Sequence, residues 1–445
     1  MSGISDALNS SANHLLSLER SLGIIQGNVG NASTPGYARQ DLGAALDSAS
    51  VSAGLEQVSS RDEFAEQAVR RQNSQLGNFD QLSSLLAPLE QNFGASGDAE
   101  IPKSISNLFA TFSALSTNPN DNGSRQLVID RAGQLARSFN SASASLSASV
   151  ADGRRRVSGS VDSINHLAGL VRDFNASRGS QGGGAVDPSV DAKLHATLEQ
   201  LSEFADVQAL QQNDGSLTLL LSGQTALVVG QNQYKIQADV TSASTVSIRD
   251  SSGADITSLV SGGRLSAGLK AVNQLLPGYQ DGINQLARGI ADSVNGVLAN
   301  GVDVNGNPGA PLFAYTDPNA GATLAVTGIA IGELAAATPG AVGGNGNALA
   351  LSALETSPAV NGLNFARFYG DLSAGVGRDV ADALDNRDLQ KQLLSQARDR
   401  RSQSSGVSLD EQAVRLVEYQ RAYESTAKLV TILDQLSQET IDMIR

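Results

Sequence analysis

The sequence predicts a mainly α-helical fold with a small β insertion. Three observations carry this prediction: apolar residues recur at helical spacing at both termini, the same spacing fills most of the interior, and two-residue alternation is confined to the middle. We expect an elongated, nested molecule, with terminal coiled-coil helices, a helical-bundle domain and a small antiparallel β domain.

The first helix is predicted over residues 4–29. Its apolar seam alternates steps of four and three and comprises Ile4, Leu8, Ser11, Leu15, Leu18, Leu22, Ile25 and Val29. A seam with this heptad repeat needs a partner helix to cover it. At 1.5 Å per residue the helix is about 40 Å long.

A turn is predicted directly after this helix. Asn31 follows Gly30 at the helix end, and Pro35-Gly36 is a typical turn pair before Tyr37. We expect Pro35 and Tyr37 to fix the angle at which the chain leaves the helix.

The closing helix is predicted to start after Ser408, where Ser408 and Glu411 have the spacing of a capping box with two reciprocal hydrogen bonds. Its apolar face comprises Leu409, Ala413, Leu416, Tyr423, Ala427, Val430, Leu433 and Leu436. Two arrangements would account for the apolar faces of the two terminal helices. The helices cover each other as an ordinary hairpin, or other copies of the molecule cover part of their apolar surface.

The interior alternates between helical and extended patterns. Residues 42–60 look extended, and helical spacing then covers residues 61–93, 102–115, 128–171, 188–204, 265–298 and 365–401, with a kink expected at Pro277. Asn213-Asp214-Gly215 predicts a hairpin between residues 207–212 and 216–221. Further strands are expected over 234–238, 246–248, 312–315 and 323–327.

This order predicts three domains, each assembled from separated parts of the chain. The terminal coiled-coil domain takes residues 1–40 and 406–445. The helical-bundle domain takes residues 41–204, 262–300 and 346–405. The antiparallel β domain takes residues 205–261 and 301–345.

Composition excludes several classes of function. With 445 residues and a net charge of −14, the chain lacks the clustered cations that nucleic-acid binding requires. It has no Cys and hence no disulfides. It also has no apolar run of eighteen residues, so we expect no membrane insertion, and it shows no cleavable signal peptide.

We predict no catalytic, cofactor-binding or metal site. His14, His166 and His195 each stand singly on a helical pattern, without an acidic neighbour at ligand spacing. The segment that begins at Asp303 imitates a calcium loop, but Pro308 replaces the required Gly, so a turn is the better interpretation.

Both ends of the chain resemble a known family. Asn28, Asn31, Ala32, the tetrapeptide Thr34-Pro35-Gly36-Tyr37 and the pair Arg39-Gln40 resemble the N-I-A-N-A-x-T-P-G-Y-x-R-Q signature of bacterial flagellar axial proteins, with Val29-Gly30 in place of Ile-Ala. Residues 406–413 and 419–423 resemble the closing helix of these proteins. Rod, hook and hook-associated proteins share both ends.

The interior narrows the resemblance to the hook-associated protein 1 family of hook–filament junction proteins. The segments that carry it are residues 61–64, 118–121 with Arg125, 214–216, 227–230, 303–306 and 312–313.

The resemblance implies a structural subunit that self-assembles through its terminal helices. The resemblance also implies that its neighbours are the hook protein below and a second junction protein or flagellin above. It implies an extracellular location, which the protein would reach by type III export with a chaperone and without a cleaved signal. We expect the terminal helices to be poorly ordered in the free subunit and to order on assembly. The alternatives are a hook or distal-rod subunit, a secreted coiled-coil adhesin, or an enzyme with a disguised site.

Overall fold

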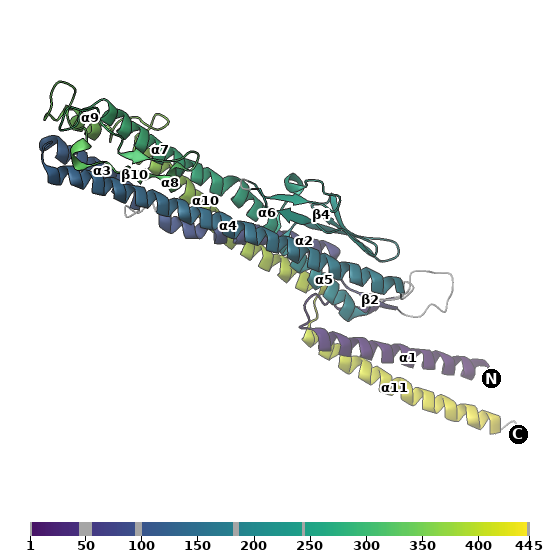
Figure 1. Ribbon diagram of the computed structural model, residues 1–445. Helices are drawn as coiled ribbons and strands as arrows, with labels where there is room; N and C mark the ends of the chain where they lie inside the picture. The colour runs from purple at the N-terminus through teal and green to yellow at the C-terminus, as the bar shows by residue number, and fades with distance from the viewer. Residues whose placement is uncertain (1, 44–55, 94–99, 181–186, 243–244, 443–445) are drawn as a thin grey trace. The chain divides into compact units, whose positions relative to one another are not determined.

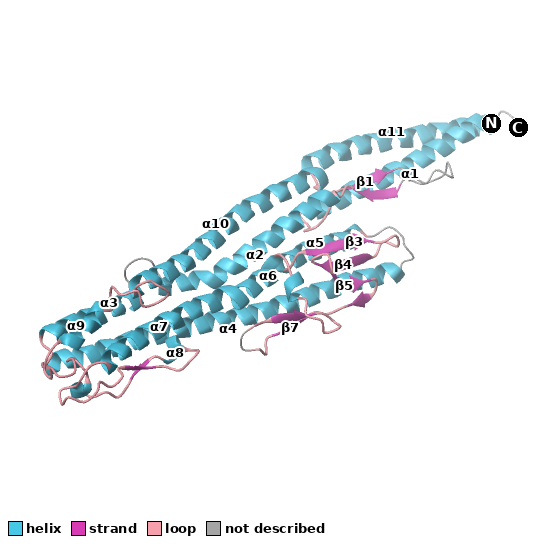
Figure 2. Cartoon of the chain, turned by 90° about the horizontal axis from the view of Figure 1, so that it is seen from above, coloured by secondary structure: helices cyan, strands magenta, loops and turns pink. Residues whose placement is uncertain are grey.

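The computed structural model describes residues 2–43, 56–93, 100–180, 187–242 and 245–442 (Figure 1). It confirms the mainly α-helical fold with small antiparallel sheets (Figure 2). The chain forms two compact units. Unit 1 contains Met1–Leu76, Ser163–Lys235 and Gln390–Arg445, and unit 2 contains Gly77–Asp162 and Ile236–Leu389. The assignment of three domains stays a prediction.

Three long helices contribute residues to both units: α2 (Glu63–Phe93), α4 (Asn122–Ser180) and α10 (Phe365–Ser405). They correspond to predicted helical segments. Gly153 and Gly159 lie inside α4 without ending it, because helical residues on both sides keep the apolar period.

Unit 2 adds mainly shorter helices. They are α3 (Glu100–Thr117), α6 (Gly263–Lys270), α7 (Leu276–Ala299), α8 (Ala320–Thr323) and α9 (Gly346–Ala353), with 3₁₀ turns η1 (Thr257–Leu259) and η3 (Ile331–Glu333). Its strand pairs are β7 (Gln237–Asp239) with β8 (Ser247–Arg249), and β9 (Phe313–Ala314) with β10 (Ala325–Val326). Its core is aromatic and aliphatic, and the rings of Phe109 and Phe365 stack at 5.6 Å between centroids.

The helix expected over residues 265–298 is present in three parts. A π-helical turn, η2 (Ala271–Leu275), joins α6 to α7 immediately before Pro277. Proline lacks the N–H that an α-helix would use here, and a π turn is a common way to accommodate such a local change in hydrogen bonding.

The segment that begins at Asp303 is a turn. The Asp303 carboxylate accepts the N–H groups of Asn305 and Asn307, at 2.7 and 2.8 Å. The carboxylate therefore stabilises its own loop, as aspartate commonly does in turns.

Unit 1 contains the terminal helices and the larger sheet. Its own elements are α1 (Ser2–Asn31), α5 (Pro188–Phe204), α11 (Leu409–Asp442) and the hairpin of β1 (Gln40–Gly43) with β2 (Glu56–Ser59). The sheet runs in the order β3 (Val207–Gln211), β4 (Leu217–Leu221), β5 (Thr225–Val229) and β6 (Asn232–Gln233). Residues 44–55 of the predicted extended stretch lie outside the described residues.

The predicted hairpin at Asn213-Asp214-Gly215 joins β3 to β4. Gly215 has φ +75°, which favours glycine, and the Asp214 carboxylate accepts the Ser216 N–H at 2.9 Å. Asn175 of α4 holds the sheet, since its side-chain amide donates to the Leu217 carbonyl at 2.8 Å and accepts the Leu217 N–H at 2.8 Å. The sheet is therefore fixed to a helix by a buried polar contact.

Candidate assembly interface

The two terminal helices lie side by side in both views (Figures 1 and 2). On α1, Leu18 and Ile25 are buried, with 5% and 3% of their surfaces exposed. The predicted seam residues Ile4, Leu8, Leu15 and Leu22 are half-buried, whereas Val29 is 45% exposed. Thus α11 covers part of the predicted seam.

The predicted face of α11 divides in the same way. Leu416, Ala427, Val430 and Leu433 are half-buried, whereas Leu409, Ala413 and Tyr423 are exposed. The role of these residues in assembly stays a prediction. Their burial shows that each helix is the other's partner along one side only.

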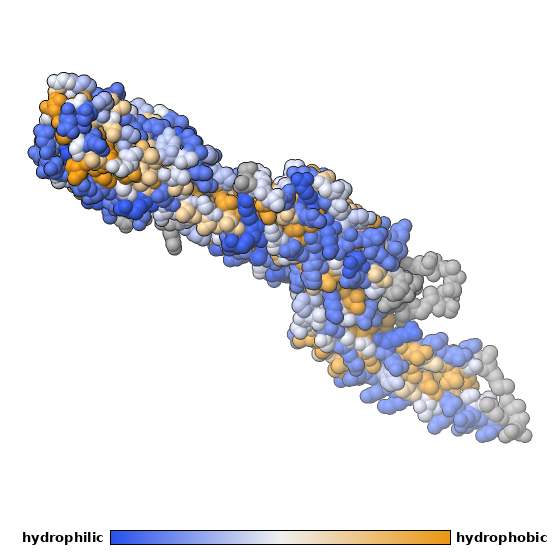
Figure 3. Space-filling model, viewed as in Figure 1, coloured by the Kyte–Doolittle hydropathy of each residue, from blue (hydrophilic) through white to orange (hydrophobic). Residues whose placement is uncertain are grey.

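A second apolar face on α11 has no cover within the described chain. We call it the outer stripe, and it comprises Val414, Val417, Leu429, Ile432 and Leu436, each between 45% and 60% exposed. At 100° per residue these five positions fall on one side of the helix, opposite Leu416 and Val430. Apolar side chains on the terminal helices are visible at the surface in Figure 3. Glu418, Arg421 and Ser425 lie on the same side of α11 between Val417 and Leu429, so the outer stripe has two apolar parts. Exposed apolar side chains grouped in this way favour an interaction surface.

Asn28 connects the two terminal helices to the segment that leaves α1. It is 1% exposed, and its side-chain amide donates to the Gln40 carbonyl at 2.9 Å and to Gln412 Oε1 at 3.2 Å. Its Oδ1 accepts from the Gln40 N–H at 2.9 Å and from the Tyr37 hydroxyl at 3.0 Å. This buried amide is therefore fully bonded, which burial of a polar group requires.

The end of α1 and the turn that follows it contain the predicted residues Asn31, Pro35, Gly36 and Tyr37. The Asn31 side chain donates to the Gly27 carbonyl at 3.0 Å, and its Oδ1 accepts from the Thr34 hydroxyl at 3.2 Å. Gly36 has φ +76°, and a Cβ there would lie 2.2 Å from the Ala192 carbonyl oxygen of α5. Glycine is therefore required both by its backbone conformation and by the close approach of α5. Burial raises the pKa of the Tyr37 phenol.

The start of α11 departs from the predicted capping box. Ser408 Oγ accepts the Glu411 N–H at 3.4 Å, as expected. The Glu411 carboxylate, however, accepts from Arg415 at 2.6 Å and lies 3.7 Å from Arg39, so the predicted return bond to the Ser408 backbone is wrong. Two guanidinium groups attract the carboxylate more strongly than a neutral N–H does.

A buried ionic cluster lies beside the turn. Arg61 donates to Glu66 at 2.6 Å, to Asp191 at 2.7 Å and to the Gly36 carbonyl at 2.7 Å. Arg401 joins Glu66 to Glu199, at 3.2 and 2.6 Å. The side chains of Arg61 and Glu66 are only 9% and 3% exposed. The cluster therefore joins α2, α5 and the end of α10 to the segment that carries α1.

The prediction that His195 has no acidic neighbour at ligand spacing is wrong. Asp191 stands four residues earlier on α5, and its Oδ1 lies 3.6 Å from His195 Nε2. Burial, and then the charges of Arg61, Arg70 and Arg401, lower the pKa of His195 to about 3. The imidazole is therefore neutral at ordinary pH, and its role is packing within the cluster.

Apolar spacing did not identify the central residues of this region, although both lie in the segments that resemble the flagellar axial proteins. Asn28 and Gln412 are polar, and a search for apolar spacing passes over them although they are buried. No cluster of three or more His, Asp or Glu suited to a metal ion occurs among the described residues. In the same part of the chain, no helix is both long and apolar enough to cross a bilayer.

Two protein-family models match the chain. The model described as flagellar hook-associated protein FlgK helical domain matches residues 86–313. The model described as flagellar basal body rod FlgEFG protein C-terminal matches residues 400–443, which include all of α11.

Curated and solved relatives agree with these matches. Flagellar hook-associated protein 1 of Bacillus subtilis is 23% identical over an alignment of 477 positions, gaps included, that covers 93% of this chain and 93% of the relative. The protein of that name from Salmonella typhimurium is 23% identical over an alignment of 338 positions that covers 71% of this chain and 60% of the relative. The structure of the flagellar hook junction protein FlgK from Burkholderia pseudomallei has a TM-score of 0.70 at 17% identity, and the match covers 77% of this chain and 100% of that one. This last likeness shows the fold.

Proposed function

The chain belongs to the flagellar hook-associated protein FlgK family, and on that basis we propose that it is a structural subunit of the bacterial flagellum at the junction between hook and filament. It assembles there through its terminal helices. The observation that carries this mechanism is the outer stripe of α11, which stays exposed although α1 and α11 already cover each other. Surface of this kind is buried when identical subunits pack into a helical lattice.

Fixed geometry at the helix base supports the same mechanism. Asn28 holds both helices to the segment after α1, and Arg61 holds that segment to α5 through Gly36 and Asp191. A subunit that joins two different structures needs its inner helices at a set position relative to its outer parts. We propose that these contacts supply it and that the protein has no catalytic role.

The proposed neighbours are other copies of the chain, the hook protein below, and a second junction protein or flagellin above. The protein reaches this position by type III export, with a chaperone and without cleavage of a signal. The flagellum of the source bacterium is thus its proposed location.

Electron microscopy of a strain that lacks this gene tests the proposal. We expect hooks without filaments, and we expect the full-length gene to restore filaments. A gene lacking residues 1–30 should yield a protein whose remaining parts fold but which does not join the hook. Filaments on hooks in the gene-deleted strain, or rescue by the truncated gene, would contradict the proposal.

A further inference from the structure

Strand β3 forms a free edge of the four-stranded sheet. The order β3-β4-β5-β6 places β3 at one side, with β4 as its only strand neighbour in the described chain. The ladder runs without a shift from Val207 opposite Leu221 to Gln211 opposite Leu217. An exposed strand edge presents unpaired backbone groups on which another strand can form.

The hydrogen bonds beside this ladder show which backbone groups are unpaired. The Asp206 carbonyl accepts the Ser222 N–H at 2.8 Å, so the backbone groups of Asp206 point toward β4. The direction of the backbone hydrogen-bonding groups alternates from one residue to the next along an antiparallel strand. The N–H and C=O groups of Val207, Ala209 and Gln211 therefore point away from β4. No described residue bonds to these outward groups. Three donors and three acceptors are thus unpaired along one edge of the described sheet.

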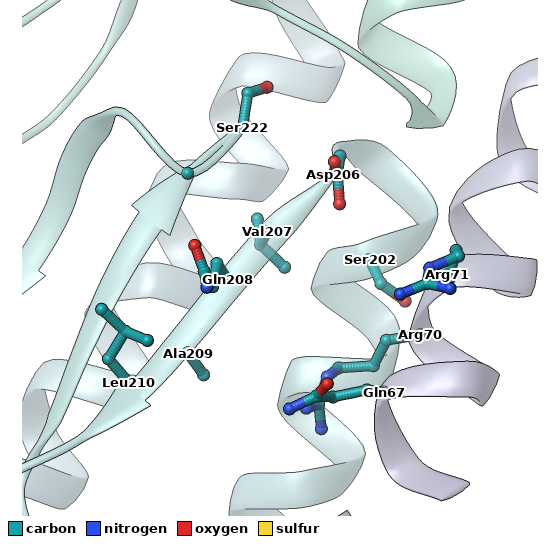
Figure 4. Close-up of a pocket in the computed structure, with 11 residues that line it drawn as sticks. Gln67, Arg70, Arg71, Ser202, Asp206, Val207, Gln208, Ala209, Leu210 and Ser222 are labelled. Carbon is teal, nitrogen blue, oxygen red and sulfur yellow. The ribbon is translucent and has the colours of Figure 1, made fainter. Parts of the chain in front are cut away.

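Two hollows meet along the same edge. The first, of about 340 Å³, lies between β3 and the Gln67, Arg70 and Arg71 side of α2 (Figure 4). The second, of about 470 Å³, continues past Ala209 and Leu210 toward the hairpin turn. Gln67, Ala209 and Leu210 line both hollows, so they form one groove beside the strand. Leu210 is 40% exposed and gives this groove an apolar contact.

The groove carries arginines whose guanidinium donors are only partly used. Arg71 has no carboxylate within 4.0 Å in the described chain, and neither has Arg178 in the second hollow. Arg70 is more deeply placed, with 7% of its side chain exposed; its Nη2 bonds to Glu63, but its Nη1 is buried and has no hydrogen-bond partner. The Nε of Arg178 is likewise buried and unpartnered. Buried guanidinium donors of this kind favour a negatively charged acceptor.

We propose that the β3 edge is a docking site for an extended, acidic segment of a neighbouring subunit in the axial structure. The segment adds a fifth strand beside Val207, Ala209 and Gln211, and its carboxylates reach Arg70, Arg71 and Arg178. Backbone bonds provide the affinity and the arginines select the acidic sequence, as in other cases of strand addition. The identity of the partner as an axial subunit rests on the proposed function, whereas the edge, the groove and the charges do not.

Site-specific cross-linking tests this docking site. The chain has no Cys, so Gln208→Cys gives one thiol in the first hollow for a benzophenone maleimide. After incorporation into flagella and irradiation, mass spectrometry should find the label at position 208 joined to another chain, within three residues of an Asp or Glu.

Two further changes separate strand addition from mere proximity. Ala209→Pro removes one outward N–H, which an edge strand tolerates, and should lower the cross-link yield at least fivefold. Arg71→Glu should lower it similarly, while Arg155→Glu, at a side chain 71% exposed outside the groove, should leave it unchanged. Melting curves of the purified variants show whether each variant is folded. If Ala209→Pro does not fold, the test rests on Arg71→Glu alone.

Incorporation and cross-linking report on different claims. A labelled subunit that enters flagella but forms only intrachain cross-links, or a yield that Arg71→Glu does not change, overturns the docking site and leaves the proposed function intact. Failure of the unaltered protein to enter flagella overturns the proposed function instead.

Discussion

Asn28 of α1 donates a hydrogen bond to Gln412 of α11, 3.2 Å from Nδ2 to Oε1, across 384 residues of sequence. The same side chain also bonds to Gln40 and Tyr37 in the segment that follows α1. One buried amide therefore sets the register of two helices and the direction of the chain that leaves them.

Asn28→Ala should destabilise the helix base by about 2–3 kcal/mol, because the buried Gln40 N–H and Tyr37 hydroxyl lose their shared acceptor. Hydrogen exchange at residues 37–43 measures the loss as faster exchange. Asn9→Ala, at an exposed position of the same helix, is the matched control and should not slow or speed exchange there.

Gly36→Ala should displace the turn from α5, because its Cβ would overlap the Ala192 carbonyl and its φ of +76° disfavours any side chain. We expect a lower melting temperature and faster exchange in residues 31–41. The control is Gly30→Ala, which has open space around it and lies in a helix, where alanine adds up to about 1 kcal/mol of stability. Equal effects of the two changes would contradict this account of the turn.

Glu66→Gln should destabilise unit 1 by about 3–5 kcal/mol, since Arg61 and Arg401 both bond to this carboxylate, which is 3% exposed. Thermal unfolding followed by circular dichroism measures the change. Glu418→Gln, at an exposed position of α11, should alter the melting temperature little. A small effect at Glu66 would contradict its role as the shared buried partner of Arg61 and Arg401.

Because the pKa of His195 is lowered in the folded chain, we expect the stability of the protein to depend on pH. This pKa is about 3 in the folded chain, against an ordinary value of 6.5, so the unfolded chain binds the additional proton between these values. Stability is therefore complete above pH 6.5 and falls as pH decreases toward 3, by about 1.4 kcal/mol per pH unit from this group. Denaturant unfolding at pH 7 and pH 5 should show a smaller loss for His195→Gln than for the unaltered chain, and identical losses would refute the assignment.

Periodicity predicted the helices well because their apolar positions repeat over many turns. The hairpin between β3 and β4 was likewise predictable from Asn213-Asp214-Gly215, whose turn chemistry is local. The face of α1 that packs on α11 was less predictable. Its buried positions include Ser21 and Asn28, and a polar residue is buried only where a partner from elsewhere in the chain completes its hydrogen bonds.

Other features depend on tertiary structure and could not be predicted from local pattern. The free edge of β3 depends on sheet order, and the Arg61 cluster depends on α2, α5 and α10 meeting. The contact between His195 and Asp191 is different, because a spacing of four residues on a predicted helix already indicated it.

The central claim is that neighbouring subunits bury the outer stripe of α11. Maleimide labelling of Ile432→Cys tests it most directly, because the chain has no other Cys and Ile432 is 53% exposed in the single chain. We predict fast labelling of the free subunit, labelling at least tenfold slower in intact flagella, and recovery of the fast rate when the flagella are dissolved in guanidinium chloride. Equal rates in the free subunit and in intact flagella would contradict the claim.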